Sequence, residues 1–148
     1  MEFESYFIES GGKPIVINGE KIYLYDEIDV SGKQSLTINF ESTNSKWRQG
    51  IMIMFPKIVA FSIEGSEHSG KRAIFWEDTA PQYVRVSWSE KLKFVKVYNT
   101  WEVNGGFHSL HNGAAMKKIN RENSLLYLCN DGYPDQDFDD LVFSIAFP

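Results

Sequence analysis

Cysteine is almost absent from this 148-residue sequence, which contains only Cys129, so no disulfide can form within the chain. Cys129 ends the apolar segment 125–129, where we expect it to be a small buried residue. No segment has the roughly 20 consecutive apolar residues that a membrane helix needs, so membrane insertion is not expected. Residues 1–10 lack the basic-then-apolar pattern of a signal peptide. We therefore expect a protein that is cytoplasmic at synthesis, with non-classical export left open.

A run of basic residues is also missing. The 15 Lys and Arg residues are outnumbered by 20 Asp and Glu residues, which gives a formal net charge of −5. Nucleic-acid-binding proteins usually carry a basic face that displaces counterions from phosphates, so nucleic acid is not expected as a partner. The 43% apolar content argues against a disordered chain. The length suits a single domain that covers residues 1–148.

Convincing helical periodicity is absent, and alternation with a period of two residues dominates instead. Asn18-Gly19 lies between two β-rich runs and predicts a hairpin with a type I′ turn. Leu36, Ile38 and Phe40 alternate with polar residues, so they are expected on one buried face. Pro56 interrupts the apolar segment 50–65 and predicts a strand break or a bulge. The whole pattern predicts an all-β protein, an antiparallel, jelly-roll-like β-sandwich of about ten short strands, with a barrel as the alternative.

Negative charge is concentrated near the C-terminus, immediately before the strand-like segment 141–147, whose alternate apolar residues are expected in the core. Residues 129–148 contain five aspartates and no Lys or Arg, namely Asp131, Asp135, Asp137, Asp139 and Asp140. Residues two apart share a face of an extended chain, so Asp135, Asp137 and Asp139 are expected to converge, with Phe138 opposite. Neighbouring carboxylates repel one another unless a cation lies between them, and oxygen ligands suit Ca²⁺. The five aspartates are therefore candidate Ca²⁺ ligands.

Two other interpretations of the aspartates stay open. Aspartate favours turns in its own right, and charge beside a strand discourages pairing between sheet edges. Alternatively, an acidic surface can bind a basic protein partner. An EF-hand is excluded, because Asp140 stands where its turn glycine is expected and Ala146 where its last glutamate is expected.

The segment DQDFDDLVFSI, residues 135–145, resembles the signature D-x-D-[FY]-[ND]-D-[LVM]-V at the last strand of several families of calcium-associated, secreted or surface β-sandwich domains. The resemblance implies Ca²⁺ held by the aspartates at the tip of the sandwich. LYLCNDGYPDQDFDDLVFSI is similar, more weakly, to the final hairpin of small calcium-dependent galactose-binding lectins. That likeness places Asp131, Asp135 and Asp139 at ligand positions, whereas Phe138 stands where another oxygen ligand is expected.

Aromatic residues supply candidate ligand-binding faces. Indole and phenol rings can stack on sugars, and the candidates are Trp47, Trp101 and Tyr133. Trp47 is favoured among the tryptophans, because the segment 43–50 is typical of a loop. His108 and His111 are two further candidates, as a weak zinc pair or as a general base.

Motifs of common enzyme classes are missing. The sequence has no G-x-S-x-G elbow, no H-E-x-x-H and no P-loop. Glu77, Asp78 and Glu102 are not specific enough to indicate a glycosidase. The sequence thus favours a non-enzymatic binding module over an enzyme. This module is expected to hold Ca²⁺ in residues 131–140, and carbohydrate is the ligand class that it could bind. The alternative is a small acidic immunity- or inhibitor-type protein that binds a basic protein.

Overall fold

Strands make up most of the chain in this computed structural model, which describes residues 3–133 and 137–148. Twelve strands and one short helix lie within these residues, and every strand pair is antiparallel. In chain order they are α1 (Glu4–Ser10), β1 (Ile15–Ile17), β2 (Glu20–Ile22), β3 (Asp26–Asp29), β4 (Ser35–Thr43), β5 (Arg48–Ile63), β6 (Ser66–Trp76), β7 (Tyr83–Trp88), β8 (Phe94–Val103), β9 (Gly106–Ser109), β10 (Ala115–Asn120), β11 (Ser124–Asn130) and β12 (Leu141–Ala146).

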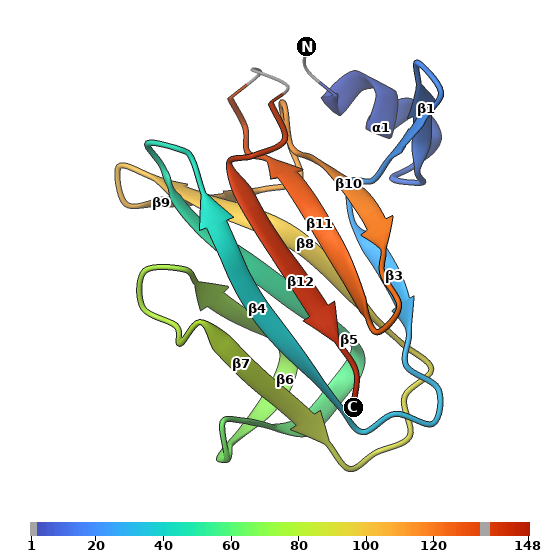
Figure 1. The fold of residues 1–148 in the computed structure, drawn as a ribbon, viewed down its shortest axis with the longest axis vertical. Helices are drawn as coiled ribbons and strands as arrows, with labels where there is room; N and C mark the ends of the chain where they lie inside the picture. Colours follow the sequence, from blue (N-terminus) through green and yellow to red (C-terminus); the bar gives the residue numbers. More distant parts are fainter. Residues whose placement is uncertain (1–2, 134–136) are drawn as a thin grey trace.

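One long sheet curls over itself to form two layers. Its strand order is β10-β11-β12-β4-β7-β5-β8-β3, while β6 pairs with β5 and β9 with β8. β10, β11, β12 and β4 form the layer nearer the viewer in Figure 1, and β5 and β8 cross behind them. The predicted all-β, sandwich-like fold is confirmed, and continuous hydrogen bonding joins its layers.

The core lies between the layers and follows the period-two pattern. Leu36, Ile38 and Phe40 of β4 are buried, as predicted. On the neighbouring strand β12, Phe143 pairs with Phe40 and Ile145 with Ile38, and both β12 residues are buried. Burial of these faces removes apolar surface from water, which is the main favourable contribution to folding.

Two local predictions at turn residues are confirmed. Asn18 and Gly19 both have positive φ, 52° and 79°, and connect β1 to β2 as a type I′ turn requires. Pro56 lies inside the continuous strand β5, whose register with β6 shifts between Met54 and Val59. The proline is therefore accommodated at a bulge, where the strand pairing with β6 is interrupted and no N–H is needed from it.

Helix α1 was not predicted from the alternating residues 1–10. It places Phe3 and Phe7, four residues apart, on the same side, where they join Ile22, Ala115 and Phe138 in a small apolar cluster. The tertiary contacts of these two phenylalanines outweigh the local strand-like pattern. Among the described residues, no helix has the length and apolar character needed to span a membrane.

A buried polar group, the Asp26 carboxylate, joins β3 to the opposite layer. Its Oδ2 accepts hydrogen bonds from the Tyr127 hydroxyl at 2.6 Å and from Lys118 Nζ at 3.0 Å. Burial raises the pKa of Tyr127 well above its usual value, and the nearby Asp26 charge raises it further. Tyr127 therefore stays protonated and serves as a donor to Asp26.

Tyr127→Phe removes the hydroxyl donor and leaves Asp26 with fewer partners in a buried position. We expect the free energy of unfolding to fall by about 1–3 kcal/mol, the usual cost of a buried polar group that loses its partner. Urea denaturation measures this change, with Tyr83→Phe as the control because Tyr83 is 60% exposed. Equal stability of the two variants would contradict a structural role for this network.

Candidate functional site at the tip of the sheet

Two loops meet at one end of the sheet (Figure 1). The Trp47 loop (residues 44–47) joins β4 to β5, and the acidic loop (residues 131–140) joins β11 to β12. They meet because β12 lies beside β4, with Leu141 paired to Thr43. Asn44 strengthens the contact, since its N–H donates to Asp140 O at 3.1 Å and its Nδ2 donates to Asp139 Oδ2 at 2.8 Å.

The Asp131 carboxylate connects the two loops. Its Oδ2 accepts hydrogen bonds from Ser45 Oγ at 2.6 Å and from Gln49 Nε2 at 3.0 Å, while its Oδ1 accepts from the Tyr133 N–H at 2.9 Å. Asp131 is 0% exposed, and its bond to Gln49 is buried while its bonds to Ser45 and Tyr133 are partly buried. Hydrogen bonds to a charged acceptor are about twice as strong as neutral ones. Asp131 is thus a clamp within the protein, and both of its oxygens have protein donors.

Asp140 and Phe138 fix the second half of the acidic loop. Asp140 is 2% exposed and its Oδ2 accepts from the Asp131 N–H at 2.9 Å. The Phe138 N–H donates to Asn130 Oδ1 at 2.6 Å, and the Phe138 ring packs 5.8 Å from that of Phe3. Phe138 has a φ of 55°, so the extended chain that was predicted through Asp137 and Asp139 is wrong at this residue. Burial of the phenyl ring beside α1 accounts for this turn.

Trp101 lies in the core beneath the acidic loop. It is 1% exposed, and a Cβ at Gly132 would come within 2.6 Å of its Cζ2. The absence of a side chain at Gly132 therefore allows the loop to rest on the indole. Trp101, proposed from the sequence as a stacking surface, supports the loop and offers no open face to a ligand.

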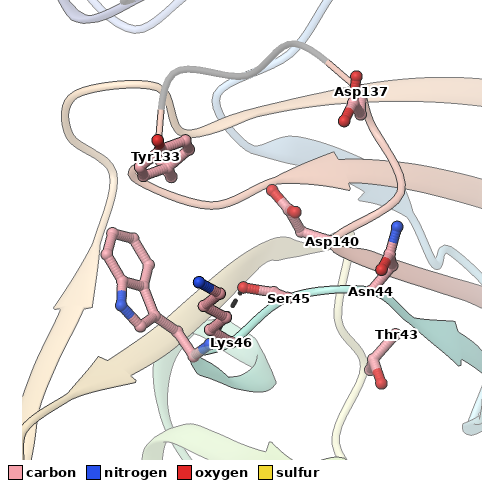
Figure 2. Close-up of a pocket in the computed structure, with 8 residues that line it drawn as sticks. Thr43, Asn44, Ser45, Lys46, Tyr133, Asp137 and Asp140 are labelled. Carbon is pink, nitrogen blue, oxygen red and sulfur yellow. Dashed lines mark hydrogen bonds between the residues drawn. The ribbon is translucent and has the colours of Figure 1, made fainter.

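A pocket of about 720 Å³ opens between the two loops (Figure 2). Tyr133, Asp140 and Asp137 lie along one side of it, and residues of β4 and the Trp47 loop along the other. The described residues that line it are Thr43, Asn44, Ser45, Lys46, Trp47, Tyr133, Asp137 and Asp140. The structure thus brings Trp47, Tyr133, Asp137 and Asp140 together in one site.

The two aromatic residues of the pocket touch each other. The rings of Trp47 and Tyr133 meet edge to face, with centroids 6.1 Å apart and planes at 78°. The Trp47 backbone is fixed on both sides, because its N–H donates to Ser45 Oγ at 3.1 Å and its carbonyl accepts from Gln49 Nε2 at 3.1 Å. Trp47 is half-buried and Tyr133 is 60% exposed, so part of this pair faces solvent.

Sequence reasoning missed the contribution of residues 43–46, which supply hydroxyl, amide and ammonium groups to the pocket. The polar run before Trp47 was the available signal. These residues reach the pocket because β4 pairs with β12, and this pairing cannot be read from the sequence. His108 and His111 are not among the residues that line this pocket.

The carboxylates of the acidic loop differ in their burial and in their hydrogen-bond partners. Within residues 3–133 and 137–148, no three His, Cys, Asp or Glu residues form a group that could hold a metal ion. Asp137 and Asp140 line the pocket, and Asp139 Oδ1 is buried without a hydrogen-bond partner in the same part of the chain. Both oxygens of Asp131 accept from protein donors, and Asp140 Oδ2 accepts from the Asp131 N–H. Asp135 lies outside the described residues.

Other reactive groups near the site are occupied. Burial raises the pKa of the Cys129 thiol, and the nearby Asp140 raises it further, so the thiol is neutral and poorly nucleophilic. Asp78 and Glu102 both pair with Arg48, at 2.8 Å and 3.4 Å, and Arg48 lies 4.5 Å from the Trp76 ring. Two of the three carboxylates considered for glycoside hydrolysis, Asp78 and Glu102, thus belong to a surface ion-pair cluster.

Comparison with models of protein families finds no match, and comparison with curated proteins finds none either. The class of protein is therefore inferred from the geometry of this site.

Asp131→Ala would leave the Ser45, Gln49 and Tyr133 donors without their acceptor. We expect a loss of about 1–3 kcal/mol in the free energy of unfolding, even in EDTA, because the role of Asp131 needs no metal. Asp137→Ala is the matched control, and this exposed residue should change stability by no more than about 0.5 kcal/mol in EDTA. Denaturant unfolding measures both variants. Similar losses in the two would contradict the clamp.

Proposed function

We propose that this chain is a non-enzymatic binding module that takes a carbohydrate in the pocket between the Trp47 loop and the acidic loop. The observation that supports this proposal is the contact between Trp47 and Tyr133 beside a polar pocket wall. Sugar rings present apolar C–H faces that pack on aromatic rings, and hydroxyl groups that need hydrogen-bond partners. The pocket offers both kinds of surface.

The polar groups of the pocket suit the hydroxyls of a sugar. The carboxylates of Asp137 and Asp140 accept hydrogen bonds, Lys46 donates them, and the hydroxyls of Thr43 and Ser45 can do either. The volume of about 720 Å³ lies within the range of about 300–1,000 Å³ typical of small-molecule sites. A neutral, hydroxyl-rich ligand therefore matches this lining better than a purely apolar one.

Hydrogen bonds within the protein hold part of the pocket wall in place. The Asp131 clamp fixes Ser45 on one loop and the Tyr133 N–H on the other. A binding surface ordered in advance loses less conformational entropy when its ligand binds. The fixed backbone of Ser45 and Tyr133 therefore supports the proposal of a ligand-binding site here.

Ca²⁺ on the acidic loop is the second part of the proposal. The resemblance of residues 135–145 to calcium-associated β-sandwich domains supports it, as does the buried Asp139 oxygen without a hydrogen bond among the described residues. Asp137, Asp139 and Asp140 would hold the ion, and Asp135 is a further candidate from the sequence. Bound Ca²⁺ would offset part of the negative charge of the loop and offer coordination positions to ligand oxygens.

Binding of a basic protein is supported less well. That function would benefit from carboxylates presented to solvent, but Asp131 and Asp140 are buried and Asp139 is partly buried. The acidic loop therefore offers a smaller acidic surface than its sequence suggests. Carbohydrate binding is the function that the geometry favours.

Truncation of either pocket aromatic should weaken sugar binding. Wild-type protein is screened on a glycan array in Ca²⁺, and the best ligand is measured by calorimetry with Trp47→Ala and Tyr133→Ala. We expect the affinity of each variant to be about tenfold lower, which corresponds to a loss of about 1.4 kcal/mol in binding free energy. Tyr83→Ala is the control, because Tyr83 is as exposed as Tyr133 but lies on β7 outside the pocket. The proposal fails if no glycan binds, or if Tyr83→Ala and Tyr133→Ala lose affinity equally.

Calcium should stabilise the folded chain by mass action. We expect the Tm in millimolar Ca²⁺ to exceed that in EDTA by several degrees, because an ion that binds only the native state shifts the unfolding equilibrium. Asp137→Ala should abolish most of this difference, while Glu67→Ala, an exposed substitution on β6, should retain it. Identical melting of the wild type in both buffers would exclude a calcium site.

A further inference from the structure

His108 and His111 form a contact pair outside the pocket and outside the proposed function. His108 lies in β9 and His111 in the turn that follows it. Nδ1 of His108 and Nε2 of His111 are 3.1 Å apart, and both side chains are half-buried. Two imidazole nitrogens thus point to the same small volume at the surface.

The backbone around His111 is held in an unfavourable conformation. Leu110 and Asn112, on either side of it, have φ values of 59° and 54°. The left-handed region costs a residue such as leucine roughly 1–2 kcal/mol. Conformations of this kind persist where the surrounding structure enforces them, and they gather at functional sites. Here the strained turn brings His111 back toward His108.

Trp101 forms the base on which both rings rest. The His108 ring stacks on its indole with planes at 15° and centroids 6.3 Å apart, and the His111 ring lies 5.3 Å away. Thr100 Oγ1 donates to the His108 carbonyl at 2.6 Å, which also fixes the end of β9. The positions of the two nitrogens are therefore determined by packing on a buried residue.

We propose that His108 Nδ1 and His111 Nε2 bind one divalent transition-metal ion of the Cu²⁺, Ni²⁺ or Zn²⁺ class. Imidazole nitrogen is a preferred ligand of these ions. With metal–nitrogen bonds of about 2.05 Å, a nitrogen separation of 3.1 Å gives a ligand–metal–ligand angle of about 98°. This angle lies between the octahedral and the tetrahedral values, so the separation of the two nitrogens suits one shared ion, and each ring turns to direct its lone pair at that ion.

Binding replaces a proton by the metal. The hydrogen bond between the rings requires a hydrogen on one of the two facing nitrogens, and that hydrogen is released or moves to the other nitrogen of its ring. The described residues contribute no third His, Cys, Asp or Glu to the pair, so water fills the remaining positions. The site is open to solvent. It offers nitrogen ligands, whereas the acidic loop offers oxygen ligands.

The test uses untagged protein titrated with Cu²⁺ in excess Ca²⁺ and followed by electron paramagnetic resonance. We expect one bound Cu²⁺ per chain, with nitrogen couplings from two imidazoles. His108→Gln and His111→Gln should each lose one coupled nitrogen and bind Cu²⁺ at least about tenfold more weakly, since even changes outside the ligand set cost that much. His68→Gln is the matched control, because His68 is the third histidine and lies exposed on β6.

A second readout needs no substitution. Cu²⁺ bound at the pair sits close to the Trp101 indole, so wild-type tryptophan fluorescence should fall with the same affinity and recover in EDTA. A wild-type spectrum without nitrogen coupling would overturn the proposal and leave a simple hydrogen-bonded pair. Unchanged Cu²⁺ affinity in both His108→Gln and His111→Gln would overturn it as well.

Discussion

The buried Asp131 carboxylate is the group on which the arrangement of the tip depends. A buried charge is costly unless hydrogen bonds and partners compensate for its lost hydration. Here Ser45 of the Trp47 loop, Gln49 of β5 and the Tyr133 N–H of the acidic loop provide that compensation. The same bonds that satisfy the carboxylate therefore fix the position of each loop relative to the other.

This constraint explains why the acidic segment can lie directly before a buried strand. Its described aspartates do not act alike, because Asp131 is buried among protein donors, Asp140 is buried but lines the pocket, and Asp137 is exposed beside it. The Phe138 ring is also buried and packs near α1. The described carboxylates of this loop thus divide between buried positions that organise the backbone and positions that line the pocket.

The sequence was informative where structure is set by local pattern. Alternation identified the buried faces of β4 and β12, and Asn18-Gly19 identified a turn whose geometry requires positive φ. Trp47, Tyr133 and the aspartates were also recognised as candidates for one site. The pairing of β12 with β4, which makes residues 43–46 part of that site, is a contact between distant segments. No local pattern encodes such pairing, and the same limit concealed helix α1, the inward turn of Phe138 and the burial of Trp101.

The indole N–H resonances of the four tryptophans test most directly whether a ligand occupies the space between the two loops. A ¹⁵N spectrum is recorded while the best glycan from the array is added in Ca²⁺. The account predicts a saturable shift of the Trp47 resonance and little change at Trp88, whose Nε1–H is bound to the Lys33 carbonyl before the start of β4. A saturable shift of Trp88 with an unmoved Trp47 would place the ligand elsewhere and contradict the proposed site.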